Sequence, residues 1–156
     1  MSEQAEPATQ TDVVVELEQI EVDAPRVGII MGSKSDMDVM DGAAKVLREA
    51  DVHHEGRVMS AHRAPDTVAE YCANARMRGL RVIIAGAGLS AALPGVAAAH
   101  TDLPVIGVPL SSRLSAIGGL DAILSVLQMP PGVPVAGVGL DTAKNAGHLA
   151  LRIRGA

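Results

Sequence analysis

The chain has 156 residues, the length of one domain, with a formal net charge of −5 at pH 7 and 20% charged residues. Hydrophobic residues make up 48% but include no Phe, no Trp and one Tyr, which predicts a core of Val, Ile, Leu, Met and Ala. With few aromatic side chains for base stacking and no basic stripe, the composition argues against nucleic-acid binding.

Compartment signals favour a cytoplasmic protein that does not bind a membrane. No apolar run approaches the roughly 20 residues of a membrane span, and the first residues lack the basic-then-apolar order of a signal peptide. The single cysteine, Cys72, excludes an intramolecular disulfide and fits a reducing compartment.

The first 25 residues form a strongly acidic segment. They hold seven of the 18 acids and no Lys or Arg, so the rest of the chain carries 18 − 7 = 11 acids against 13 bases. We expect residues 1–24 to be a disordered acidic arm and residues 25–156 to be one folded domain. Residues 13–22 could instead add an edge strand to the sheet.

From Arg26 onward, apolar strand-like runs alternate with helix-like segments. The predicted strands are 27–31, 52–59, 81–85, 104–108 and 133–139, and the predicted helices lie near 36–49, 65–78, 94–100, 119–128 and 142–153. Alternation predicts a parallel sheet with helices on both faces, and nearly all-apolar strands agree with burial on both sides. The expected fold is α/β, a flavodoxin-like three-layer α/β/α sandwich with a parallel five-stranded sheet in the order 2-1-3-4-5.

Local signals place the ends of several helices. Ser35 or Asp36 can N-cap the first helix, and Pro65 and Pro94 each suit the first position of a helix. Cys72 shares a helical face with other apolar residues, which favours packing over a role as nucleophile.

Loops 32–36, 60–64 and 86–93 follow the first three strands and should meet at one edge of the sheet. The first offers glycine, hydroxyls, a carboxylate and free N–H groups at a helix start, which suits a phosphate and ribose hydroxyls. The alternative is that Ser35 and Asp36 are only helix caps.

The second loop carries the strongest chemical signal. His62 is the only one of five histidines in a polar loop at the carboxyl end of a strand, where an imidazole can give and take protons near neutral pH. Arg63 has the fork geometry that binds phosphate or carboxylate. The alternative is a surface His-Arg pair. No histidine has a convincing metal-ligand spacing with Cys, Asp or Glu, so no metal is expected.

The third loop, within residues 85–98, is almost free of polar side chains. It lacks the third glycine and the downstream acid of a dinucleotide fingerprint. Its glycines can approach a flat ligand closely, and a dry pocket beside His62 could hold carbon dioxide. A packed strand-to-helix connection explains the same glycines.

Six ordered motifs together resemble one family, the N5-carboxyaminoimidazole ribonucleotide mutases of de novo purine biosynthesis. The resemblance covers essentially Val27 to Ile153. The motifs are MGSKSD (31–36), SAHRAPD (60–66), AGAGLSAALPG (85–95), LPVIGVP (103–109), GGLDAILSVLQMPPGVPV (118–135) and KNAGHLAL (144–151).

The resemblance implies a reaction that moves a carboxylate from the exocyclic nitrogen of an aminoimidazole ribonucleotide to ring carbon 4, with no cofactor. It implies that His62 is the catalytic acid and base. It also implies a ribonucleotide-binding set and a pocket around the carboxyl group that moves. The implied ribonucleotide-binding residues are Ser33, Asp36 and Arg63, supported by Ser35 and Ser60. The implied pocket residues are Ala87, Gly88 and Leu93.

Two other functions remain open. One is an aminoimidazole ribonucleotide carboxylase that uses carbon dioxide directly, although Arg63 and the intact Leu-Pro-Gly of the third loop favour the mutase. The other is a non-catalytic nucleotide-binding module, which would not need a base at His62. Ala92 stands where many bacterial members of the family have histidine.

The resemblance also implies a homo-oligomer, most simply an octamer, with sites at subunit junctions. Two apolar features agree with this expectation. One is the apolar stripe along the final helix, from Ala143 to Ile153, and the other is the apolar turn at 128–131. We expect both to be covered by a neighbouring subunit.

Overall fold

The computed structural model describes residues 24–155, so nearly all of the expected acidic arm lies outside the described residues. Strands and helices alternate as the sequence predicts. The elements are β1 (Val27–Met31), the 3-10 helix η1 (Lys34–Asp36), α2 (Met37–Glu49), β2 (His54–Val58), α3 (Pro65–Asn74), β3 (Val82–Gly88), α4 (Leu93–Ala99), β4 (Val105–Leu110), α5 (Leu120–Leu127), β5 (Ala136–Gly137) and α6 (Ala143–Arg154).

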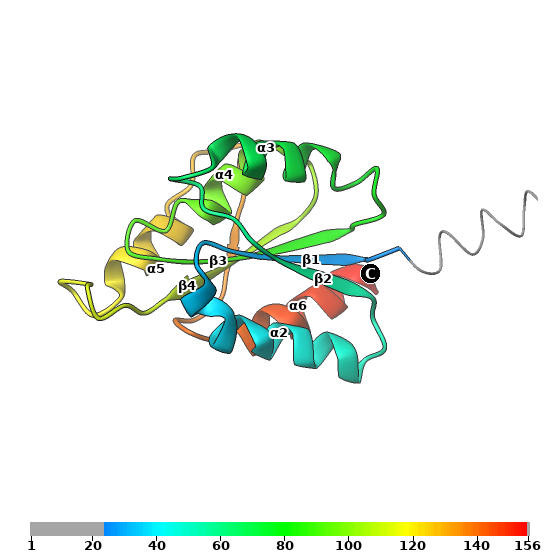
Figure 1. Cartoon of the computed structure of the whole chain (residues 1–156), viewed down its shortest axis with the longest axis horizontal. Coiled ribbons are helices and arrows are strands. Elements are labelled where there is room, and N and C mark those ends of the chain that lie inside the picture. Colours follow the sequence, from blue (N-terminus) through cyan, green and yellow to red (C-terminus); the bar gives the residue numbers. More distant parts are fainter. Residues whose placement is uncertain (1–23, 156) are drawn as a thin grey trace, which may run out of the picture.

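The sheet has five parallel strands in the order β2-β1-β3-β4-β5, which confirms the predicted α/β fold and strand order. Figure 1 shows α3 and α4 on one face and α2 and α6 on the other. Helix α5 lies on the same face as α4 and buries Ala122 and Val126 there. The Val126 side chain and Pro94 of α4 both lie against Gly107 of β4. Helices therefore cover both faces.

Alternation along the central strands sends side chains to two apolar layers. Ile29, Ile84 and Ile106 pack with Met40 and Leu47 on the side of α2 and α6. The neighbouring residues on the same strands face α3 and α4, as a strand's period of two requires; they include Ile30, Ile83 and Val105. Aliphatic burial on both faces makes the middle of the sheet a rigid support for the loops at its ends.

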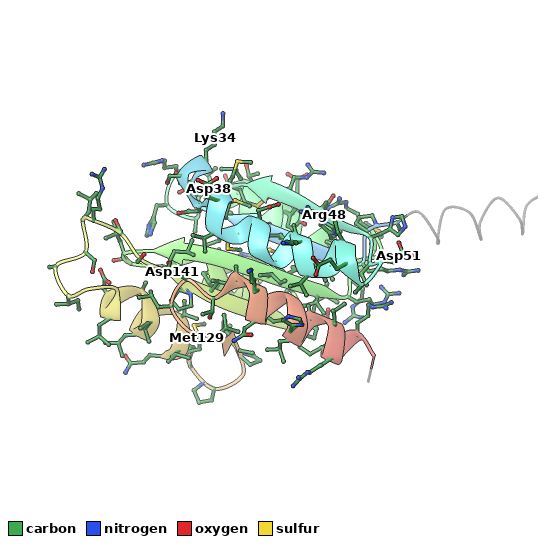
Figure 2. The ribbon with its side chains drawn as sticks, turned by 90° about the horizontal axis from the view of Figure 1, so that it is seen from below. Lys34, Asp38, Arg48, Asp51, Met129 and Asp141 are labelled. Atoms are coloured by element: carbon green, nitrogen blue, oxygen red, sulfur yellow. The ribbon has the colours of Figure 1, made fainter. Side chains whose placement is uncertain are left out.

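Helix α6 is covered by its own chain, which corrects the expectation that its apolar stripe needs a partner subunit. Ala143, Ala146 and Ala150 are buried in the layer that contains α2. A Cβ at Gly147 would lie 3.0 Å from the carbonyl oxygen of Ala43, so the two helices approach closely through small residues. Figure 2 shows them side by side.

The two outer strands, β2 and β5, are more exposed than the sequence predicted, since both faces of every strand were expected to be buried. Strand β2 spans 54–58 rather than 52–59, and its residues are half-buried or exposed. It pairs on one side only, with β1, and its sequence His-Glu-Gly-Arg-Val suits an edge. Strand β5, at the other edge, has two exposed residues.

The helix starts agree with the predictions in part. Pro65 is the first residue of α3, as expected, whereas Pro94 is the second residue of α4. Asp36, one of the two predicted residues, occupies the N-cap position of α2, although its side chain makes no capping bond there. The side-chain cap of this segment is Ser33, which accepts from the Ser35 amide at the start of η1. Cys72 is fully buried in the layer beneath α3, which confirms its packing role.

The single aromatic residue, Tyr71, joins α3 to the edge strand. Its hydroxyl donates to Glu55 Oε1 at 2.8 Å, and Arg78 donates to both Glu55 oxygens at 2.7 Å. The Arg78 guanidinium lies 5.3 Å from the Tyr71 ring centre. Burial and the bond to Glu55 raise the pKa of Tyr71. A Cβ at Gly28 would lie 2.4 Å from the Tyr71 hydroxyl oxygen, so only glycine leaves room for this cluster.

Candidate functional site

The loops after β1, β2 and β3 begin at one edge of the sheet. Met31 at the end of β1 is in register with Val58 on one side and Gly86 on the other. Two further bonds extend the alignment into the loops: the Met59 amide donates to the Met31 carbonyl at 2.8 Å, and the Gly32 amide donates to the Gly86 carbonyl at 3.3 Å. The rigid sheet therefore brings the three predicted loops together.

The first loop is held by hydrogen bonds among Ser33, Ser35 and Asp36. The Ser33 amide donates to Asp36 Oδ2 at 3.1 Å, and Ser33 Oγ accepts from the Ser35 amide at 3.2 Å. The two serine hydroxyls lie 2.9 Å apart. Burial raises the pKa of the Asp36 carboxyl, and the Ser33 amide partly opposes that rise. Lys34 points away from the molecule (Figure 2), so it is not part of this arrangement.

The second loop is a tight turn organised by Ser60. Its hydroxyl oxygen accepts from the Arg63 amide at 3.2 Å, and its carbonyl accepts from the Ala64 amide at 2.8 Å. The turn leads into α3 at Pro65 and leaves His62 and Arg63 exposed. Within residues 24–155 the Arg63 guanidinium has no hydrogen-bond or ion-pair partner, so its donors are available to an anionic ligand.

His62 is held by the third loop. Its Nε2 lies 3.1 Å from the carbonyl oxygen of Ser90. A carbonyl oxygen only accepts, so Nε2 carries the hydrogen of this bond and Nδ1 holds the lone pair of the neutral ring. Sequence reasoning did not identify Ser90 as a partner, and its side chain offered no signal because the contact uses a backbone atom.

The third loop turns sharply to present that carbonyl. Leu89 adopts a left-handed backbone with φ 55°, and the Ala91 amide donates to the Leu89 carbonyl at 2.8 Å. A left-handed conformation is uncommon for leucine and is held by its surroundings, a situation that concentrates at ligand sites. No property of the Leu89 side chain predicts this conformation.

The predicted carboxyl-pocket residues occupy two different environments. Ala87 and Gly88 are half-buried at the end of β3, at the edge that the loops share. Leu93 begins α4 and is 1% exposed, packed in the apolar layer beneath α3 and α4. A Cβ at Gly88 would lie 3.0 Å from the Leu110 carbonyl oxygen, so glycine keeps β3 and β4 close there.

The arrangement supplies an imidazole, a guanidinium, hydroxyls and a carboxylate beside a nearly apolar strand end. These groups suit binding of a phosphorylated sugar and proton transfer to a flat ring. Among the residues that the structure describes, no group of three His, Cys, Asp or Glu side chains could hold a metal ion. No helix in residues 24–155 has both the length and the apolar character needed to cross a membrane.

A second polar contact at this edge was missed by sequence reasoning. Asp141 has φ 57° and its Oδ1 accepts from the Ser111 amide at 2.8 Å, which joins the segments after β4 and β5. Asp141 and Asp38 line a hollow of ≈ 370 Å³ at the starts of α2 and α6. Figure 2 labels both residues on this side of the molecule.

Comparisons with known proteins point to one family. Residues 26–156 match the model of the AIR carboxylase family. The chain is 58% identical over 134 residues to the N5-carboxyaminoimidazole ribonucleotide mutase of Pyrococcus abyssi, which covers 86% of this chain and 76% of that protein. It is 56% identical over 131 residues to the mutase of Thermotoga maritima, covering 84% and 75%. The crystal structure of Treponema denticola PurE superposes with a TM-score of 0.74 at 33% identity, covering 84% and 80%.

Proposed function

The chain belongs to the AIR carboxylase family, and we propose that it is an N5-carboxyaminoimidazole ribonucleotide mutase of purine biosynthesis that acts in the cytoplasm. Its substrate would be N5-carboxyaminoimidazole ribonucleotide and its product 4-carboxy-5-aminoimidazole ribonucleotide. The names of the relatives from Pyrococcus abyssi and Thermotoga maritima support this reaction over the direct carboxylase. The catalytic domain would be residues 25–156.

The observation that carries the proposal is the position of His62 between the second and third loops. In the first step the bond from the exocyclic nitrogen to the carboxyl carbon breaks, and the nitrogen keeps the electron pair and takes a proton. In the second step ring carbon 4 bonds to the released carbon dioxide and loses its own proton. A single histidine that enters as the imidazolium, gives its Nδ1 proton in the first step and takes a proton back on Nδ1 in the second ends in the state in which it began.

The bond to Ser90 assigns this work to one nitrogen of His62. Because Nε2 is committed to the carbonyl, Nδ1 is the atom that exchanges the proton. The backbone contact also fixes the orientation of the imidazole, as a positioned acid or base requires. No cofactor takes part, since the ring itself is the carbon nucleophile.

The remaining site residues would bind the ribonucleotide. Ser33 and Arg63 hold the phosphate, Asp36 accepts from the ribose hydroxyls, and Ser35 and Ser60 keep the loops in shape. The hydrogen bonds made by Ser33, Ser35 and Ser60 within their loops support the last role, and the exposed Arg63 supports the first.

Carbon dioxide would be held where β3 ends. Ala87 and Gly88 form a wall that has no polar side chain and little side-chain volume. Leu93 supports that wall from the core. Excluding water there keeps the released carbon dioxide close to ring carbon 4.

The active form would be a homo-octamer. Its support is an apolar surface on and before α5, which we term the α5 face, rather than the buried stripe of α6. Its large apolar side chains are from 40% to 81% exposed, and exposed apolar side chains gathered on one segment are typical of protein contact surfaces. The residues are Leu114, Ile117, Leu120, Leu124 and Leu127.

A comparison of two substrates tests the proposed reaction. The purified chain should convert N5-carboxyaminoimidazole ribonucleotide without ATP, and should turn over aminoimidazole ribonucleotide plus bicarbonate at least about 10²-fold more slowly, the scale of positioned catalysis. Equal rates would assign the direct carboxylase instead.

A further inference from the structure

A second hollow, of ≈ 470 Å³, lies at the amino-terminal edge of the sheet, opposite to the candidate site. Its position follows from the topology, because the residues just before β1, β3 and β4 meet there. The Arg81 amide donates to the Arg26 carbonyl at 2.8 Å, and the Ile83 amide donates to the Pro104 carbonyl at 3.0 Å. We term it the arginine hollow; it is lined by Arg26, Arg76, Arg81, Arg154, Leu103 and Pro104, among others.

The arginine hollow combines positive charge with an apolar wall. Four arginines line it, and the neighbouring carboxylate, Asp102, pairs with Arg76 at 3.0 Å. Leu103 is 5% exposed and Val82 is fully buried, so the floor is aliphatic. The hollow therefore suits an extended segment that carries both carboxylates and aliphatic side chains.

The sequence just before the hollow has that composition. Residues 1–23 contain seven acids and no Lys or Arg, and residues 16–23 read Glu-Leu-Glu-Gln-Ile-Glu-Val-Asp, with acids and aliphatic residues interleaved. The described chain begins at this edge: a Cβ at Gly79 would lie 3.0 Å from the Cβ of Ala24, and Arg26 itself lines the hollow. Figure 1 shows the start of β1 and the end of α6 at the same end of the molecule.

We propose that the acidic segment 16–23 binds to the arginine hollow of its own chain. Two independent features favour this occupant over a free anion. The charges are complementary in sign, and covalent attachment three residues away gives an effective concentration on the order of millimolar or more. The contact requires no regular structure in the segment, because the guanidinium groups donate to its carboxylate side chains and not to its backbone.

The opposing interpretation is that the arginines serve only local roles. Arg154 lies in the last turn of α6, where a cation balances the helix dipole, and Arg76 already has its carboxylate. A small polyanion is the other possible occupant. The test must therefore separate the segment from both.

Disulfide trapping in the full chain tests whether the acidic segment occupies the hollow. One new cysteine replaces Gln19 in the acidic segment, and a second replaces Pro104 in the hollow, which leaves all four arginines in place. A matched control carries Gln19→Cys with Ala50→Cys, an exposed neutral position at the end of α2 on the same edge of the molecule. The native Cys72 does not compete, because burial raises the pKa of its thiol to about 11.

The proposal predicts that the pair with Pro104→Cys closes at least about tenfold faster than the control at low salt, and that about 1 M NaCl removes the difference, since the Debye length falls to ~3 Å. Adding Glu16→Gln, Glu18→Gln and Glu21→Gln should remove it too. Equal rates at low salt, or a preference that persists in 1 M salt, would overturn the proposal. Crosslinks between two chains would overturn binding within one chain.

Tripolyphosphate distinguishes the small-anion alternative. If the segment occupies the hollow, the triple glutamine variant should bind tripolyphosphate at least about tenfold more tightly than the unmodified chain, because a competitor has been weakened. Arg81→Gln should abolish that gain. Equal binding to both chains would mean that the segment does not compete there, and would contradict the proposal.

Discussion

His62 and Ser90 are joined across 28 residues of sequence, with Nε2 of the imidazole 3.1 Å from the backbone carbonyl oxygen. The contact links the loop that carries the acid and base to the loop that begins at the apolar end of β3. It fixes the ring against the strand end where the carboxyl group would move. The proposed chemistry therefore depends on the orientation of His62 as much as on its presence.

We predict that His62→Gln folds and still binds the product nucleotide but loses at least about 10²-fold in kcat. Glutamine can still donate an amide hydrogen to Ser90, yet it cannot exchange protons near neutral pH. Steady-state kinetics and product titration measure the two effects separately. Turnover near the normal rate, in this variant and in His62→Asn, would remove His62 from the reaction.

Arg63→Ala should weaken binding of the product nucleotide by roughly 10- to 150-fold, which corresponds to about 1.5–3 kcal/mol for a charge-assisted contact. Binding of the corresponding nucleoside, which lacks the phosphate, should change little. Arg57→Ala is the control, since Arg57 lies exposed on β2 and pairs with Glu55 at 3.4 Å. Equal losses for nucleotide and nucleoside would mean that Arg63 does not bind the phosphate.

The fold was predictable where the sequence pattern is strong and local. Aliphatic runs such as Val27 to Met31 identified the central strands, and Pro65 marked the start of α3. The edges were less predictable, because 52–59 mixes apolar residues with a polar stretch that only an edge strand tolerates. Whether a strand lies at an edge depends on its neighbours in space, which a single run of residues does not state.

The site was predictable to the extent that it uses side chains. The positions of Ser33 after one parallel strand and of His62 and Arg63 after the next indicated that their loops meet, and the register of Met31 confirms it. The carbonyl of Ser90 and the left-handed backbone of Leu89 are properties of the folded chain. Neither residue type signals them.

Gly28→Ala should destabilise the fold by about 1–3 kcal/mol, because its Cβ would overlap the hydroxyl of Tyr71. In a Tyr71→Phe background the same change should cost clearly less, since the overlapping oxygen is gone. Urea unfolding at fixed protein concentration measures both. Gly56→Ala on β2 is the control, as nothing lies within 4 Å of its Cβ. Equal costs of Gly28→Ala in both backgrounds would show that Tyr71 is not the obstacle.

Burial raises the pKa of Cys72 from the ordinary 9.0 to about 11. A thiol that holds its proton more tightly in the folded state contributes stability below the unfolded pKa and loses it as pH rises through the folded one. Two pKa units correspond to about 3 kcal/mol. Between pH 9 and 11 the free energy of unfolding should therefore fall more steeply for the unmodified chain than for Cys72→Ala. Parallel slopes would contradict the burial argument.

The α5 face should be the main contact between subunits. Leu124→Glu together with Leu127→Glu should dissociate the assembly and lower activity with it, because a buried carboxylate in an apolar interface is costly. Met77→Glu is the control, at 82% exposure on another part of the surface. Light scattering with a parallel activity assay checks this, and a fully active monomer would show that the site is complete within one chain.

The central claim, that the carboxyl group moves within one closed site, is tested most directly by following a carbon-13 label. N5-carboxyaminoimidazole ribonucleotide labelled in its carboxylate is converted by excess enzyme in a single turnover, with unlabelled bicarbonate in solution. Carbon-13 NMR then reads the carboxylate of the product. The mutase predicts that the label is retained at the carboxylate on ring carbon 4. A product with an unlabelled carboxylate would show that carbon dioxide comes from solution, and would contradict the account.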